Sequence, residues 1–242
     1  MQGLCGEEKG ITMKLDMETT LTAIKKFNSD RFLVANDWLI YHHFSSLEKT
    51  LEPSTIESRV LILDKLWRTQ LDKRKGDSQA IADSLRSHRK EILEALSGLK
   101  KNPACDEIVE IGVKVLPFIV HPNDDARNNY SFGTKFLHWS TGGLLPIVDS
   151  RARQSIVDRQ AQWNVQPENK IKPNRDDHYL TDYEKWIRLY CQIDESLTDK
   201  ERVRLMKTDS DIPAEYRLER GNSLFRILDK AFYVWGDKVA SL

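Results

Sequence analysis

The sequence is poor in cysteine: Cys5, Cys105 and Cys191 lie far apart, their number is odd, and none belongs to a CxxC pair. Disulfide-stapled scaffolds and zinc knuckles need several closely spaced cysteines, so this usage argues against both classes. It is typical of proteins from a reducing compartment. We therefore expect a cytoplasmic protein without structural disulfides, and we expect no metal and no cofactor.

Long apolar runs are also missing, because charged residues interrupt each run before it reaches the length of a membrane span. The first residues do not place an apolar segment behind a basic one, as a secretion signal does. The sequence has no segment that alternates at strand spacing, no internal repeat, and no phosphate loop of the P-loop or GxGxxG kind. These absences predict an all-α protein that is neither anchored nor secreted. They also argue against nucleoside-triphosphate and dinucleotide chemistry.

A net charge is absent as well, because 37 basic and 37 acidic residues cancel. A balanced chain is not an undirected polycation, but it can still carry a nucleic-acid site, since a basic face can be offset by acidic residues elsewhere. The chain has 242 residues, of which 40% are hydrophobic. That is enough for one large core or for two small lobes that share an interface.

Apolar residues recur at helical spacing along most of the chain and predict about eight to ten helices. Capping boxes are expected at Ser54 with Glu57 and at Thr181 with Glu184, and Ser223 is a candidate cap for the last helix. The expected helices cover residues 17–27, 32–44, 56–71, 77–96, 105–116, 150–161, 181–193, 197–206 and 223–242, with a further short helix around Lys135. Residues 1–16 are expected to form a loose leader and 17–242 a single all-α unit. A division of that unit into lobes of about 17–120 and 121–242 stays open.

The stretch from Tyr130 to Arg153, YSFGTKFLHWSTGGLLPIVDSRAR, is the most informative one. It predicts a tight turn at Gly133, a short helix with Lys135, a Gly-Gly connection, and an apolar segment that presents Asp149. A buried amine beside a carboxylate can act in catalysis, because desolvation lowers the pKa of an amine and makes it a better nucleophile. The same pattern also fits a helix-end salt bridge, with Asp149 as the N-cap of the helix that follows.

SFGTKFLHW followed by LPIVDSRAR resembles the helix-hairpin-helix DNA glycosylase superfamily. It is most similar to bacterial proteins of the oxoguanine-glycosylase fold, in which a segment of the type SFASK and a segment PIYDS recur together. The segment ILDKLWRTQL also looks like a helix of those proteins. The specific match covers roughly a tenth of the chain. The resemblance implies a helical bundle with an active-site cleft between two helical lobes.

The resemblance also implies an activity, namely removal of a damaged or modified base, such as 8-oxoguanine, from double-stranded DNA. Lys135 would be the amine nucleophile and Asp149 the assisting carboxylate, with cleavage of the strand by an AP lyase step. The base must leave the stack and needs a pocket with aromatic faces. The implied DNA contacts are Gly133, Thr134, Arg151 and Arg153, and the candidates for the base pocket are Trp67, Phe136, His138 and Trp139.

Other interpretations of the sequence remain open. One is a non-catalytic DNA-binding or interaction module of the same fold, and another is a helical protein with an unrelated role, for example in bacterial defence. His42 and His43 contain metal-binding groups, but adjacent helical residues point about 100° apart and do not easily share one ion. The identity of the target base is not encoded in residue spacing.

Overall fold

The computed structural model of the protein describes residues 13–44, 50–67, 69, 71, 77–99, 103–120, 129–174, 178–219 and 221–237. Within these residues it contains eleven α-helices, two short 3-10 helices and no strand. The expectation of an all-α protein is therefore confirmed, while the expected number of helices was too low.

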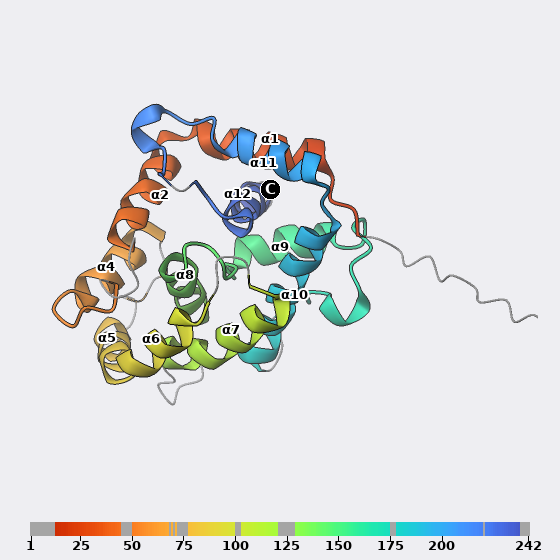
Figure 1. Cartoon of the computed structure of the whole chain (residues 1–242). Coiled ribbons are helices and arrows are strands. Elements are labelled where there is room, and N and C mark those ends of the chain that lie inside the picture. Colours follow the sequence, from red (N-terminus) through yellow and green to blue (C-terminus); the bar gives the residue numbers. More distant parts are fainter. Residues whose placement is uncertain are drawn as a thin grey trace, which may run out of the picture.

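Figure 1 shows the helices in their order along the chain. They are α1 (Met17–Ser29), α2 (Arg31–His43), α4 (Ile56–Trp67), α5 (Asp77–Ser87), α6 (Arg89–Ser97), α7 (Cys105–Ile119), α8 (Tyr130–Ser140), α9 (Ser150–Arg159), η2 (Pro167–Asn169), α10 (Tyr179–Ser196), α11 (Asp199–Asp209), η3 (Ala214–Tyr216) and α12 (Leu224–Asp237).

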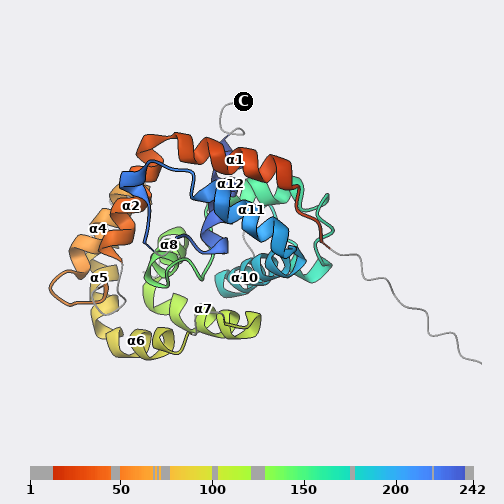
Figure 2. The same cartoon turned by 45° about the horizontal axis from the view of Figure 1, so that its top comes forward.

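Helix α12 lies at the centre of the packing, between α1 on one side and α9 on the other (Figures 1 and 2). Helices α2, α4 and α5 descend along one edge, α6 and α7 form the base, and α10 packs along α7 (Figure 2). Helix α8 lies inside, in contact with α4 and α7. The buried apolar residues form one continuous core that all these helices share.

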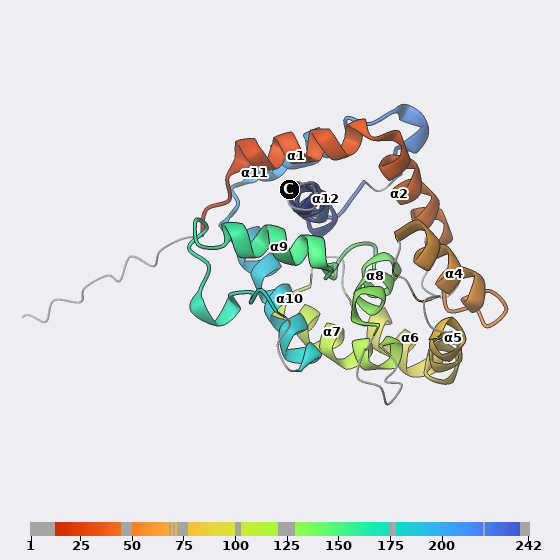
Figure 3. The ribbon, with the colours of Figure 1, turned by 180° about the vertical axis from the view of Figure 1, so that it is seen from behind.

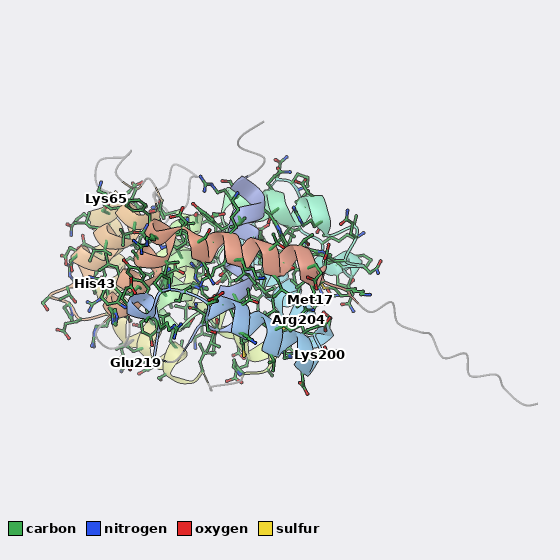
Figure 4. All side chains as sticks on the ribbon, turned by 90° about the horizontal axis from the view of Figure 1, so that it is seen from above. Met17, His43, Lys65, Lys200, Arg204 and Glu219 are labelled. Atoms are coloured by element: carbon green, nitrogen blue, oxygen red, sulfur yellow. The ribbon has the colours of Figure 1, made fainter. Side chains whose placement is uncertain are left out.

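The first and last helices of the described chain pack together. Helix α1 contacts both α11 and α12, and Arg204 of α11 lies beside the start of α1 near Met17 (Figure 4). The Arg204 guanidinium pairs with Glu18 at 2.7 Å. Helix α1 therefore packs with helices from the other end of the described chain.

Helix α12 carries three charged residues that are buried in the core. Apolar residues surround the helix, and Arg226, Asp229 and Lys230 on it are each at most 5% exposed. Burying a charge is costly unless it is paired and hydrogen-bonded. Arg226 binds Asp37, and the Lys230 ammonium lies 2.6 Å from Asp209. The predicted cap of this helix is confirmed, because Ser223 Oγ accepts a hydrogen bond from the amide of Arg226 at 3.1 Å.

The expected leader ends earlier than residue 16. Met13 and Leu15 are each 4% exposed and belong to the core, and the amide of Lys14 donates to the carbonyl of Trp163 at 3.3 Å. The alternation of buried Met13 and Leu15 with exposed Lys14 shows that this short segment lies along the surface of the core. Residues 1–12 lie outside the described part of the chain.

Two further boundaries differ from the prediction. The single helix expected over 77–96 is two helices, because the chain bends at His88, whose ring stacks on Phe118 with centroids 4.6 Å apart. Helix α10 begins at Tyr179, so Thr181 is already inside it and is not a cap. A capping box forms at Thr198, whose hydroxyl accepts a hydrogen bond from the amide of Glu201 at the start of α11.

Among the described residues, none of the helices combines the length and the apolar character that a membrane span requires.

Candidate functional site

Gly133 lies inside helix α8 and not in a turn, which corrects the sequence prediction. The helix begins at Tyr130, and the Gly133 amide donates to the carbonyl of Asn129 at 2.8 Å. A Cβ atom at this position would lie 2.4 Å from Val120 Cγ2 and 2.9 Å from Leu116 Cδ1. The glycine therefore allows the end of α7 to approach α8 closely. Its amide is already bonded, so it is not free to hold a phosphate.

Lys135 lies two residues beyond Gly133 on the same helix and is only 4% exposed. Its Nζ atom lies 3.3 Å from Oδ2 of Asp149 and donates a long hydrogen bond of 3.5 Å to the carbonyl of Trp67. The same ammonium stands 5.8 Å from the centroid of the Trp67 ring. The amine is therefore enclosed by one carboxylate, one carbonyl and one aromatic face.

Asp149 has two roles that use different oxygen atoms. Oδ1 accepts a hydrogen bond of 2.9 Å from the amide of Ala152, which makes Asp149 the N-cap of α9, as the sequence indicated. Oδ2 faces Lys135. The side chain is 16% exposed, so the carboxylate lies just below the surface, at the positive end of the α9 dipole.

Thr134 holds the backbone at Lys135 close to the backbone at Asp149. Its hydroxyl donates to the carbonyl of Val148 at 3.3 Å and accepts from the amide of Val148 at 3.1 Å. Thr134 precedes Lys135 and Val148 precedes Asp149, so this pair of bonds ties the two backbones together directly beside the site. Thr134 is fully buried and is therefore a positioning residue in the structure, with its hydroxyl turned inward.

The predicted Gly-Gly connection links the end of α8 to the segment that leads to Asp149. Gly142 and Gly143 have φ values of 63° and 85°, in the left-handed region that favours glycine. The amide of Gly143 caps α8 by donating to the carbonyl of His138 at 2.7 Å. Figure 3 shows that this short connection brings the end of α8 back to the start of α9 beside α12.

His138 belongs to the core below the site. Its Nδ1 atom lies 2.7 Å from the carbonyl of Leu145 and 3.2 Å from Oδ2 of Asp229, whose other oxygen accepts a hydrogen bond from Tyr190. Burial, with the nearby charge of Arg226, lowers the pKa of His138 to about 3. Burial raises the pKa of Asp229 to about 8. Near neutral pH the imidazole is therefore neutral and the Asp229 carboxyl is protonated, so the pair carries no net charge.

A buried ion pair borders the site on the side of the tryptophans. The guanidinium of Arg226 binds Asp37 with two nitrogens, Nε at 3.1 Å and Nη2 at 2.5 Å. Its Cζ atom lies 5.2 Å from the centroid of Trp67 and 5.1 Å from that of Trp139. Sequence reasoning missed this pair, although charged residues inside the apolar patterns of α2 and α12 were a visible signal for buried pairing.

The four candidates for a base pocket have different surroundings. Phe136 and His138 are fully buried, and the Phe136 ring packs edge-on against Phe44 with centroids 5.6 Å apart. Trp139 is 4% exposed and lies behind Trp67, with ring centroids 6.4 Å apart. Trp67 is half-buried and contacts Lys135 directly. The structure thus brings Trp67 to the Lys135–Asp149 pair and places Phe136 and His138 in the core.

The two arginines implied as DNA contacts follow Asp149 on α9. Arg153 is bound by Asp182 through two bonds of 3.0 and 2.5 Å, and Tyr130 donates to the same carboxylate at 2.9 Å. The guanidinium of Arg151 stacks on Tyr233 at 4.8 Å from the ring centroid. A phosphate at Arg153 would therefore compete with a buried carboxylate.

Cavities described in the structure lie away from this pair. One of about 660 Å³ is lined by α1, α9 and α12, and another of about 600 Å³ by α11 and the segment that follows it. Lys135 and Asp149 line neither of them.

No group of three or more His, Cys, Asp or Glu side chains in the described residues is arranged to hold a metal ion. His42 packs edge-on against Trp38 with ring centroids 4.2 Å apart.

Comparison with protein-family models, with curated proteins and with solved structures finds no match to this chain. The assignment of a function therefore depends on the site itself.

Proposed function

We propose that the protein is a DNA glycosylase with AP lyase activity, in which Lys135 is the nucleophile and Asp149 assists it. The observation that carries the proposal is the 3.3 Å approach of Lys135 Nζ to Asp149 Oδ2 just below the surface. The amine comes from a helix that follows α7 after a short connection, and the carboxylate caps the next helix. This is the order of parts that the resemblance to helix-hairpin-helix glycosylases implies.

The pair supports a defined sequence of chemical steps. As the bond between the base and C1′ breaks, positive charge develops on the sugar, and the Asp149 carboxylate stabilises it. Lys135 attacks C1′ once its proton has passed to a neighbouring acceptor, for which Asp149 is in position. The C1′–N bond forms as the base leaves, and opening of the sugar ring gives a Schiff base. Loss of the C2′ proton then expels the 3′ phosphate and cuts the strand.

Enclosure of Lys135 sets a requirement for this chemistry. Because the side chain is almost completely covered, a nucleotide reaches Nζ only after the contact with the Trp67 carbonyl is exchanged. Trp67 is half-buried and lies directly over the amine, so it is the proposed aromatic face for an extruded base. The site thus needs a local rearrangement on the α4 side, while Thr134 and Val148 hold the Lys135–Asp149 geometry.

Borohydride trapping tests the proposal directly. Duplexes that contain an abasic site, 8-oxoguanine or other modified bases are incubated with the full chain in the presence of borohydride, which reduces a Schiff base to a stable adduct. We expect an adduct with the wild type and none with Lys135→Gln. Lys114→Gln, at an exposed position on α7, is the matched control and is expected to retain trapping. If no adduct forms on any duplex of the panel, the lyase assignment is wrong.

The second candidate is a non-catalytic DNA-binding module, and the enclosure of Lys135 is the observation that favours it. A lysine that is hydrogen-bonded and paired below the surface also fits a structural ion pair. Salt-dependent binding to DNA without product on a sequencing gel would support this candidate. Base release that disappears in Asp149→Asn while folding is retained would exclude it.

A further inference from the structure

Helices α7 and α10 run antiparallel in close contact, and this contact brings two cysteines together. A Cβ atom on Gly112 of α7 would lie 2.7 Å from Ile187 Cδ1 and 3.3 Å from Tyr183 Cε1, so the helices nearly touch there. Towards the start of α7, Asp106 pairs with Arg188 at 3.0 Å. The two helices pack side by side in Figures 1 and 2.

Cys105 and Cys191 occupy the next positions along this contact. Cys105 is the first residue of α7, and Cys191 lies one turn beyond Arg188 on α10. Both are free thiols, and each is the largest influence on the pKa of the other. Cys105 is half-buried, whereas Cys191 is 7% exposed. One thiol is therefore partly accessible to solvent, whereas the other is almost completely buried.

We propose that Cys105 and Cys191 are a redox modification site that closes into a reversible disulfide when the protein meets a peroxide, with Cys105 reacting first. This inference is independent of the proposed glycosylase activity.

The surroundings of Cys105 favour it as the reacting thiol. The hydrogen bond from Cys191 lowers the pKa of Cys105, burial opposes this effect, and the Arg188 guanidinium adds to it against the carboxylates of Glu195 and Asp106. A position at a helix N-terminus also favours a thiolate. The same hydrogen bond, together with burial, raises the pKa of Cys191. Cys191 is thus the thiol that keeps its proton until the second step.

Oxidation by the peroxide takes place in two steps. The Cys105 thiolate attacks one peroxide oxygen, so an S–O bond forms, the O–O bond breaks, and the departing hydroxide takes up a proton as water. The product is a sulfenic acid on Cys105. The sulfur of Cys191 then attacks the Cys105 sulfur, so that the S–S bond forms and the S–O bond breaks. The oxygen leaves as a second water with the Cys191 proton, and the two sulfurs have supplied two electrons to the peroxide.

The test uses the full chain with Cys5→Ser, which removes the third thiol. The folded protein is treated with hydrogen peroxide, and a non-reducing digest is analysed by mass spectrometry. We expect a peptide pair linked through Cys105 and Cys191, and a melting temperature that rises on the order of 10 °C because a long loop has been closed. Dithiothreitol should reverse both changes. Thiols that stay titratable in the folded protein after prolonged exposure would overturn the proposal.

Two further variants test the order of the steps. In Cys191→Ser, the Cys105 sulfenic acid has no partner and should be captured by dimedone, whereas in Cys105→Ser we expect no dimedone adduct on Cys191. An adduct on Cys191 would contradict the assignment. Arg188→Gln keeps both thiols and should slow the oxidation of Cys105 several-fold. An unchanged rate would show that the guanidinium does not activate the thiol.

Discussion

Lys135 contacts one carboxylate oxygen of Asp149, and the other oxygen of the same carboxylate caps a helix. Oδ2 lies 3.3 Å from the Lys135 amine, and Oδ1 caps α9 through the amide of Ala152. The structural and the chemical interpretations of Asp149 are therefore compatible. The cap fixes the carboxylate, and this orientation presents Oδ2 to the amine.

Substitution of Asp149 separates these two roles. Asp149→Ser keeps a capping oxygen without the charge, whereas Asp149→Ala loses both. We expect Asp149→Ala to be less stable than Asp149→Ser by about 1 kcal/mol, which is the usual contribution of an N-cap. Urea unfolding of the two variants measures the difference. If the glycosylase proposal holds, both variants lose base release, because neither retains the carboxylate. Equal stability of the two would show that the cap contributes little.

Gly133→Ala is expected to destabilise the protein, although alanine is the better helix former. The gain in helix propensity is about 1 kcal/mol, but the new Cβ would lie 2.4 Å from Val120 Cγ2, and overpacking a core costs about 1–3 kcal/mol. Thermal unfolding should show a lower melting temperature.

Gly98→Ala is the matched control for this substitution. At Gly98 the nearest atom to a new Cβ is the Ala95 carbonyl oxygen at 3.5 Å, and φ is −70°. We expect this variant to be neutral or slightly more stable. A stabilised Gly133→Ala protein would contradict the close approach of α7 and α8.

The buried Asp229 predicts a loss of stability with rising pH. Its pKa is raised from 3.8 to about 8 in the folded protein, so the folded state holds a proton that the unfolded state releases near pH 4. This contribution to stability is complete below about pH 4 and is lost as the pH rises through about 8. We compare the wild type with Asp229→Asn, which keeps an oxygen for the Tyr190 hydrogen bond. The stability of the wild type relative to Asp229→Asn should fall by about 2 kcal/mol between about pH 6 and pH 8.

His138 predicts the opposite dependence at acid pH. Its pKa is lowered from 6.5 to about 3, so its contribution is complete above pH 6.5 and is lost as the pH falls through about 3. The difference between the urea midpoints of the wild type and Asp229→Asn isolates the contribution of Asp229, whereas the His138 effect should appear in both proteins as a fall of the midpoint from pH 6.5 towards pH 3. Parallel pH profiles of the two proteins would show that Asp229 does not hold a proton in the folded state.

The Asp37–Arg226 pair is expected to be strongly coupled. Asp37→Leu leaves the Arg226 guanidinium buried without its carboxylate, for which a loss of about 3–5 kcal/mol is expected. The double variant Asp37→Leu, Arg226→Met removes both charges and should be more stable than Asp37→Leu alone. A double-mutant cycle by chemical denaturation measures the coupling. Additive losses would mean that the two side chains stabilise the fold independently.

The sequence predicted those features that depend on neighbouring residues. Helical spacing gave the fold class, Ser223 was recognised as the cap of α12, and the Gly-Gly connection followed by Asp149 was placed at the start of α9. The proximity of Lys135 and Asp149 followed from the short span between them. Each of these inferences needed only local geometry.

Other features depend on contacts between distant segments and could not be predicted in this way. Gly133 was interpreted as a turn residue. The reason for a glycine there is its close contact in space with Leu116 and Val120, which local sequence does not show. Asp37 and Arg226 are far apart in sequence, as are Cys105 and Cys191, and only tertiary packing brings each pair together. The capping box at Thr198 with Glu201 was visible in the sequence and could have been found.

The packing of α1 against α11 and α12 has a consequence for biosynthesis. Helix α1 is translated long before α11 and α12, the two helices that supply the apolar surface covering it. Its buried residues, such as Ile24 and Phe27, therefore stay exposed while the intervening helices are translated. Folding of this helix is expected to be completed only after α12 has been translated.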